Sequence, residues 1–168
     1  KSAMSAQFNS TQSSLPTVWV VNIPNVAPGS KQALKNLFTQ YDYRVQETNL
    51  HTLQIPNEWA LAKGSADPVV KWGDIVVIPG GRAFQMVDGY NARIHLYNKK
   101  NSVKKVDYVT KLQKLSQYCH FIGVCAGAIH LSAHFILTDP YGYKSSPATE
   151  KDGSRRLLSK SINCYDNY

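Results

Sequence analysis

The stretch that decides the fold is FIGVCAGA, residues 121–128. Its first four residues are apolar or glycine, as in a strand that is covered on both faces of a sheet. The residues after Cys125 are small enough to let the chain turn sharply into a helix. The pattern predicts a buried strand, a tight turn and a helix, with the thiol presented at the corner. Unpaired N–H groups and the dipole at a helix N-terminus favour the thiolate, which is the reactive form of cysteine.

Three further strands are expected before this turn. Residues 17–23 are β-branched and aromatic and predict the first strand, and residues 44–48 alternate as a short second one. Residues 74–78 are nearly all apolar and end in Pro79-Gly80-Gly81, which is typical of a central parallel strand that opens into a tight loop. Residues 50–71 are expected to form a mixed connection.

Three helices are expected between and after these strands. Ser30 is a plausible N-cap for the first, which has apolar residues at i, i+3, i+4 and i+7, and a second helix is predicted over 102–118. A third is predicted over 128–136, and the segment after Gly81, including 88–91, is expected to be irregular. The predicted core-facing residues are Leu34, Leu37, Phe38 and Tyr41 on the first helix and Tyr108, Leu112, Leu115 and Cys119 on the second, with Lys104, Lys111 and Lys114 in solvent.

Alternation of strands and helices predicts an α/β fold with a doubly wound, mostly parallel sheet and helices on both faces. Residues 1–16 are rich in Ser, Gln, Asn and Thr and predict a flexible lead-in, and residues 17–168 are expected to form one domain. In such sheets ligands bind at the carboxyl ends of the strands, where both Gly80-Gly81 and Cys125 are expected to lie.

Two motifs together resemble a known superfamily. Ile78-Pro79-Gly80-Gly81, followed some forty residues later by GVCAGA at 123–128, is similar to the class I glutamine amidotransferase-like superfamily, and most closely to its biotin-protein ligase N-terminal-like branch. The resemblance covers about residues 18–136. It implies a flavodoxin-like fold with a cysteine nucleophile on a nucleophile elbow, but not a ligase, because nothing in the chain resembles a biotin- or ATP-binding catalytic domain.

Acyl transfer at such a site needs a nucleophile and donors for the oxyanion. Cys125 is expected to attack the carbonyl carbon, while the backbone N–H groups of Ala126 and Gly81, helped by Gly80, hold the oxygen. Arg82 is a candidate for pairing with a substrate carboxylate. The alternative interpretation is that Arg82 is a charged loop residue exposed to solvent. By composition alone a cysteine is more often a small buried hydrophobe, so a structural role for Cys125 is the competing interpretation.

The general base of the superfamily is missing from the sequence pattern. Its members carry a His-x-Glu pair on a later strand, and this chain contains no such motif. His130, one turn beyond Cys125 on the same helix, is a weak candidate base. Either the chain stops before the segment that carries the base, or the site has another chemistry or none. The leading hypothesis is hydrolysis or transfer on a small carboxamide or acyl substrate, and the alternative is an inactive ligand-binding or regulatory module.

No metal or other cofactor is predicted. His130 and His134 have the i, i+4 spacing of metal ligands, with Cys125 as a conceivable third, but two hydrogen-bonded histidines are the preferred reading. Trp19, Trp59, Trp72 and Tyr90 are assigned to core or rim packing.

Composition limits the partners. The 168 residues carry 19 Lys and Arg against 11 Asp and Glu, a net charge of +8, but the basic residues are scattered and no nucleic-acid motif accompanies them. We therefore expect a small-molecule substrate or ligand rather than nucleic acid, and no membrane span, with oligomerisation left open. Three cysteines suit a reducing, cytoplasmic setting, although an exported form and one bridge between Cys119 and Cys164 also stay open.

Overall fold

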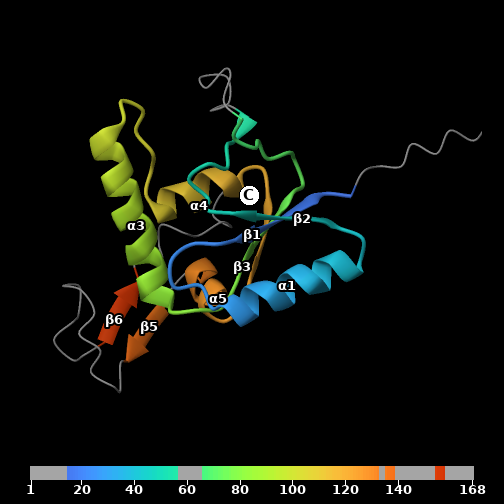
Figure 1. The fold of residues 1–168 in the computed structure, drawn as a ribbon. Helices are drawn as coiled ribbons and strands as arrows, with labels where there is room; N and C mark the ends of the chain where they lie inside the picture. Colours follow the sequence, from blue (N-terminus) through green and yellow to red (C-terminus); the bar gives the residue numbers. More distant parts are fainter. Residues whose placement is uncertain (1–14, 57–65, 133–134, 139–153, 158–168) are drawn as a thin grey trace, which may run out of the picture.

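The computed structural model describes residues 15–56, 66–132, 135–138 and 154–157 (Figure 1). Its centre is an α/β fold built on a four-stranded, all-parallel sheet in the order β2-β1-β3-β4. The strands are β1 (Thr17–Val21), β2 (Arg44–Thr48), β3 (Ile75–Ile78) and β4 (His120–Gly123). All four lie within or close to the predicted segments. The proposed lead-in falls almost wholly outside the described residues, as do Trp59, His134 and Cys164.

The two central strands, β1 and β3, are buried on both faces, because their side chains point alternately into one of two separate hydrophobic clusters. Val18, Val20 and Val77 pack with Leu34 on one face, whereas Trp19 and its alternate neighbours join the larger cluster on the other. The start of β1 is tied down by the buried Asp74 carboxylate, which accepts hydrogen bonds from the Trp19 indole and from the Thr17 and Lys71 amides at 2.9–3.0 Å.

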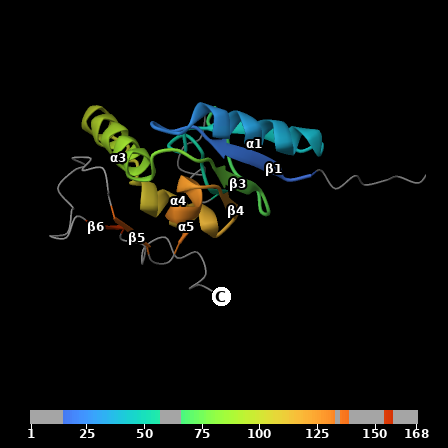
Figure 2. The ribbon, with the colours of Figure 1, turned by 90° about the horizontal axis from the view of Figure 1, so that it is seen from below.

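Helices cover both faces of the sheet (Figure 2). Helix α1 (Pro28–Gln40) lies on one face, and α3 (Ala83–Lys100), α4 (Tyr108–Ser116) and α5 (Ala126–Leu131) supply the core on the other. From β1 the chain moves outward to β2, and then returns to the other side of β1 to form β3. At such a reversal the loops after the two central strands leave toward opposite faces, and a crevice opens at the carboxyl ends.

Helix α1 differs from its prediction at its start and in its buried stripe. It begins at Pro28 after an Ala27 N-cap, so Ser30 lies in the first turn and is not the cap. Proline fits the first helical position because its missing N–H would have no partner there. Leu34 is buried and Phe38 packs beside it, but Leu37 and Tyr41 are exposed. Among the described helices α1 alone covers this face, so only a narrow stripe of it is buried.

Helix α3 corrects the expectation of an irregular segment after Gly81. Its buried residues Met86, Tyr90 and Ile94 recur at i, i+4 and i+8, which places them on one face of a helix with 3.6 residues per turn. The Asp88-Gly89 pair predicts a turn, but Gly89 is helical and lets α3 pack closely against Pro24, because a Cβ added to Gly89 would lie 2.7 Å from the Cβ of Pro24. His95 is therefore helical as well.

Helix α4 keeps its predicted stripe but is shorter than predicted. Its N-cap is Asp107, whose carboxylate accepts a hydrogen bond from the Thr110 amide at 2.8 Å. The four predicted apolar residues of the stripe are all buried. Lys111, expected in solvent, is buried too. Trp72, expected in the core or its rim, is 75% exposed and contacts the ring of Tyr118.

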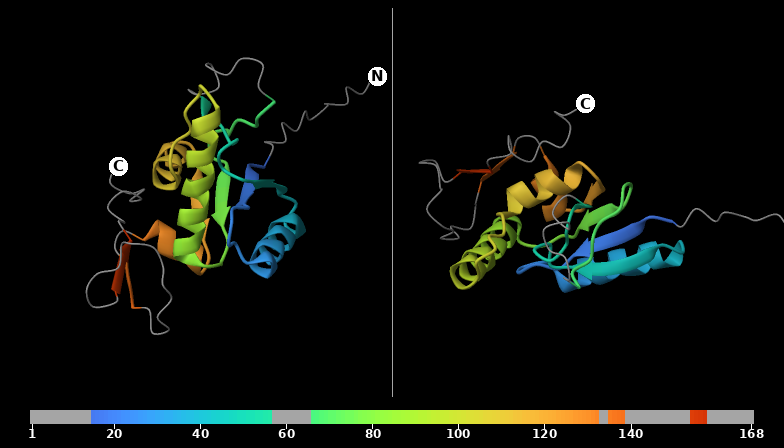
Figure 3. Two further views of the ribbon diagram at one scale, coloured as in Figure 1. Left: turned by 60° about the vertical axis from the view of Figure 1, so that its left-hand side comes forward. Right: turned by 90° about the horizontal axis from the view of Figure 1, so that it is seen from above.

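The chain after Leu131 departs most from the prediction (Figure 3). Helix α5 ends at Leu131, and Phe135 and Ile136, which are predicted to be helical, lie in β5 (Phe135–Thr138), which pairs antiparallel with β6 (Ser154–Leu157). Strand β4 is not covered on both faces as expected, because it lies at the edge of the described sheet and leaves Ile122 and Val124 partly exposed. No helix in the described ranges is both long and apolar enough to cross a membrane.

Candidate functional site

Cys125 stands at the turn between β4 and α5, where the sequence predicts it. Its backbone has φ 53° and ψ −111°, a positive-φ conformation that side chains other than glycine rarely adopt. Holding a residue there costs about 1–3 kcal/mol, and such conformations cluster at functional sites. The side chain is exposed and the thiol is free. Backbone hydrogen bonds from Val124 to Ile78 and from Gly127 to Val124, at 3.0 and 2.9 Å, fix the turn.

Two glycines let the turn close this tightly. A Cβ at Gly123 would lie 2.5 Å from the backbone carbonyl group of Gly127, and one at Gly127 would collide with the carbonyl oxygen of Ile78. The helix therefore packs directly against the end of β3. This G-x-C-x-G spacing is that of a nucleophile elbow, in which a strained strand-to-helix turn lifts the nucleophile above the sheet.

The Pro79-Gly80-Gly81 loop is fastened to the loop that follows β1. Gly80 accepts a hydrogen bond from the Ala27 amide at 2.9 Å, and the Arg82 amide donates to Asn25 at 3.1 Å. The Gly80 amide donates to the hydroxyl of Ser30 at 2.8 Å. A Cβ at Gly81 would collide with the carbonyl oxygen of Asn25, so only glycine fits this crossing.

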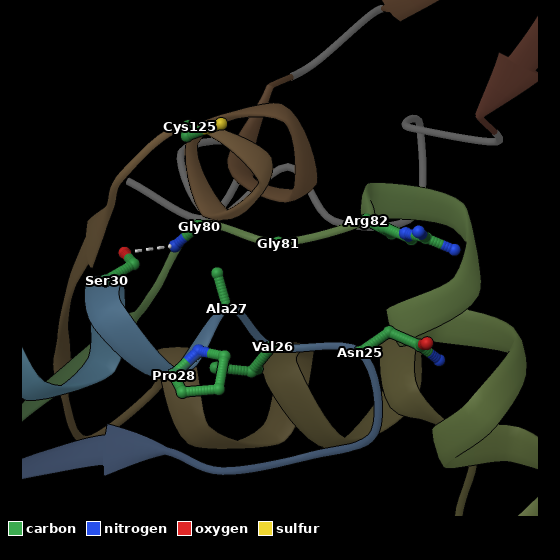
Figure 4. Close-up of a pocket in the computed structure, with 9 residues that line it drawn as sticks. All are labelled: Asn25, Val26, Ala27, Pro28, Ser30, Gly80, Gly81, Arg82 and Cys125. Atoms are coloured by element: carbon green, nitrogen blue, oxygen red, sulfur yellow. Dashed lines mark hydrogen bonds between the residues drawn. The ribbon is translucent and has the colours of Figure 1, made fainter.

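These loops and Cys125 line one open pocket of about 590 Å³ at the carboxyl ends of β1, β3 and β4 (Figure 4). A volume of this size suits a small-molecule ligand. Gly80 packs between Cys125 and Ser30, because a Cβ added to it would lie 3.2 Å from both the Cβ of Cys125 and the hydroxyl oxygen of Ser30. The described lining residues are Asn25, Val26, Ala27, Pro28, Ser30, Gly80, Gly81, Arg82 and Cys125.

Two of the three backbone donors expected at this pocket are available. No described residue accepts a hydrogen bond from the N–H of Gly81 or from that of Ala126, the first residue of α5. The N–H of Gly80, by contrast, is already engaged by Ser30. Gly81 is one of the described lining residues of the pocket, whereas Ala126 is buried next to Cys125 and is not one of them.

Arg82 lines the pocket, but its guanidinium group extends away from Cys125 (Figure 4). It is the N-cap residue of α3, and its side chain is exposed. In this conformation the guanidinium group does not face the thiol.

His130, the weak candidate base, is buried and hydrogen-bonded through both ring nitrogens. It is fully buried, with Nε2 2.8 Å from the Ala83 carbonyl oxygen and Nδ1 2.8 Å from the Tyr108 hydroxyl. Because a carbonyl only accepts, Nε2 carries the proton, and in the neutral ring Nδ1 accepts from the Tyr108 hydroxyl. Burial lowers the pKa of His130, although the hydrogen bond to Ala83 opposes this. Both nitrogens are engaged, so the ring joins α5, α3 and α4 and we do not retain it as a base.

The remaining described histidines lie away from the pocket. His51 is half-buried beside Tyr97, and burial, with Lys105 nearby, lowers its pKa. His95 is exposed on α3, and His120 begins β4 at the end opposite Cys125. None of the nine described lining residues is a histidine or an acid. Within the described residues no group of three metal-ligating side chains occurs.

The second described cysteine contrasts with the first. Cys119 is buried in the larger core, and burial, with Asp74 nearby, raises the pKa of its thiol to about 12. At neutral pH this thiol stays protonated and inert. Cys119 is therefore structural, as expected.

Comparisons with protein-family models, with curated proteins and with solved structures found no match. The interpretation of the site therefore depends on the geometry described above.

Ser30 is the site residue that sequence reasoning assigned to the wrong role. Its position after Pro28-Gly29 suggested a helix cap, whereas its hydroxyl reaches across to the Gly80 amide, fifty positions along the chain. A signal existed in the predicted topology, because the helix after β1 and the loop after β3 both begin at the same edge of the sheet.

Proposed function

We propose that this protein is a cysteine-dependent hydrolase or transferase that acts on a small carboxamide or acyl substrate, with Cys125 as the nucleophile. The observation that carries the proposal is the strained positive φ of an exposed cysteine beside a pocket that also contains the Gly80-Gly81 loop. A structural cysteine needs neither exposure nor a strained backbone.

The fold supports membership in the class I glutamine amidotransferase-like superfamily. The strand order β2-β1-β3-β4 corresponds to the first four strands of the flavodoxin-like order 2-1-3-4-5, and the pocket lies at the point where that order reverses. The PGG loop and the CAGA turn, on which the sequence resemblance depends, line or adjoin this pocket.

The proposed reaction begins when the Cys125 thiolate attacks the carbonyl carbon. An S–C bond forms, and an electron pair moves to the carbonyl oxygen, which accepts hydrogen bonds from the N–H groups of Gly81 and Ala126. Collapse of this intermediate breaks the bond to the leaving group and gives a thioester on Cys125. Water then attacks the thioester, the S–C bond breaks, and the thiolate returns as a carboxylic acid leaves and loses its proton.

The leaving group decides which substrates the described site can process. An amine must take up a proton as it departs, and the described lining offers no histidine or carboxyl group to supply it. A phenolate departs as the anion and needs no proton. Activated esters are therefore the appropriate first probes of this thiol.

The test compares two reactions of the same thiol. Acylation by p-nitrophenyl acetate passes through an oxyanion, whereas alkylation by iodoacetamide does not. We define the selectivity ratio as the acylation rate constant divided by the alkylation rate constant at Cys125, followed by peptide mass spectrometry. The control is a Gly-Val-Cys-Ala-Gly peptide, which has the same local sequence without the fold.

We expect the folded protein to exceed the peptide in this ratio by about 100-fold, since one oxyanion donor contributes about 10²–10³ in rate. Cys125→Ala should abolish the rapid p-nitrophenolate release. A ratio equal to that of the peptide would rule out the hydrolase. It would favour a ligand-binding module with the same pocket, an alternative that fits the nine described lining residues, none of which is a histidine or an acid.

A further inference from the structure

Ser30 connects two parts of the pocket that are distant in sequence, the start of α1 and the Gly80-Gly81 loop. It lies in the first turn of α1, its hydroxyl accepts a hydrogen bond from the Gly80 amide at 2.8 Å, and it lines the same pocket as Cys125. Gly80 is packed between the two, since a Cβ added to it would lie 3.2 Å from each side chain. The serine hydroxyl therefore fixes a backbone segment that packs beside the Cβ of Cys125.

The hydrogen bond matters because Gly80 is buried. A buried amide without a partner is costly, so removal of the Ser30 hydroxyl should make the loop shift until the Gly80 amide finds another acceptor. Gly81 is the next residue, it lines the pocket, and no described residue accepts a hydrogen bond from its N–H. A shift of Gly80 therefore moves that donor.

Two backbone hydrogen bonds also hold this loop. The Ala27 amide donates to the Gly80 carbonyl oxygen, and the Arg82 amide donates to Asn25. These two bonds bracket Gly81 and join it to the loop after β1, and the hydroxyl of Ser30 accepts from the Gly80 amide from the side of α1 (Figure 4). Within the described residues, Ser30 is thus the side chain that fixes the Gly80 amide.

We infer that Ser30 is a positioning residue for acyl chemistry, which holds the Gly80-Gly81 peptide so that the Gly81 N–H faces the carbonyl oxygen of a substrate attacked by Cys125. This inference rests on the proposed function. It assigns the side chain that orients the oxyanion donor and predicts that its loss impairs acylation selectively. Ser30 is not itself proposed to touch the reacting atoms.

The test measures the selectivity ratio at Cys125 in the intact chain with p-nitrophenyl acetate and iodoacetamide. We expect Ser30→Ala to lower the acylation rate about tenfold or more, because displacement of a catalytic group by about 1 Å can cost up to 10²-fold. Alkylation should stay within about twofold, since it needs no oxyanion donor. Ser30→Thr retains the hydroxyl and should restore acylation to within about threefold of the unmodified protein.

The matched control is Thr39→Ala, which removes a hydroxyl bonded to the Lys35 carbonyl at the far end of the same helix. It should leave both rates unchanged. A merely structural role for Ser30 would slow or accelerate acylation and alkylation together, and that result would overturn the inference, as would a Ser30→Thr protein as impaired as Ser30→Ala.

The two proposals fail in different ways. If the unmodified protein shows no excess of the ratio over the Gly-Val-Cys-Ala-Gly peptide, the proposed function fails and the role of Ser30 fails with it. If the excess is present and survives in Ser30→Ala, only the role of Ser30 is refuted.

Discussion

Replacement of Cys125 by glycine should make the protein more stable, although it removes the proposed nucleophile. The residue has φ 53° and ψ −111°, a conformation that glycine adopts readily and that costs other residues about 1–3 kcal/mol. Glycine loses about 0.5–1 kcal/mol more backbone entropy on folding than alanine does. The balance is a net gain of about 1 kcal/mol for Cys125→Gly over Cys125→Ala. The exposed side chain adds little to either value, because it buries little apolar surface.

The measurement is urea unfolding of both variants at one pH, with the midpoint converted to a free energy of unfolding. The matched control compares the unmodified protein with Ala128→Gly, at an exposed position of α5, where glycine should instead lower the free energy of unfolding by about 1 kcal/mol. The reasoning predicts opposite signs at the two positions. A Cys125→Gly protein less stable than Cys125→Ala would show that the turn is not strained and would remove the main support for a functional cysteine.

Three further predictions concern groups around the site. Burial lowers the pKa of His130 below its ordinary value of 6.5, so the folded state binds fewer protons than the unfolded state as the pH falls. The contribution of His130 to the free energy of unfolding should therefore be complete above about pH 6.5 and decline at lower pH. Urea unfolding of His130→Gln at about pH 5 and pH 7.5 should show a smaller pH dependence of stability than the unmodified protein. Gly127→Ala forces a Cβ into the neighbouring backbone and should cost about 2 kcal/mol or more in thermal unfolding, whereas Gly29→Ala meets nothing within 4 Å and should be neutral or stabilising. The Cys119 thiol, with its pKa raised to about 12, should resist iodoacetamide at pH 8.5 in the native protein and react once urea unfolds it, and rapid native labelling would contradict its burial.

The central strands and the cysteine turn were predictable because local and tertiary preferences agree there. Residues 75–78 are apolar throughout and are buried on both faces, and the small residues around Cys125 admit only a close turn. The pairing of the two loops followed from a general rule, since parallel strands bring their carboxyl ends to one edge of the sheet.

The errors arose where long-range packing overrides local pattern. Gly89 resembles a turn residue in sequence, yet it is helical because α3 packs against Pro24. Lys111 was assigned to solvent by its charge but is buried. The role of Ser30 depends on a partner fifty positions away, and the engagement of both His130 nitrogens depends on Ala83 and Tyr108. The predicted topology brings Ser30 and Gly80 to the same edge of the sheet, but the periodicity of the sequence does not specify which side-chain atoms then pair.

The most direct test of the central claim is the ratio of acylation to alkylation at Cys125 in the folded, unmodified protein. The account predicts a value about 100-fold above that of the Gly-Val-Cys-Ala-Gly peptide, because the N–H groups of Gly81 and Ala126 stabilise an oxyanion only in the acyl reaction. A value indistinguishable from that of the peptide would mean that the thiol stands beside the pocket without an oxyanion hole, which would contradict the proposed chemistry.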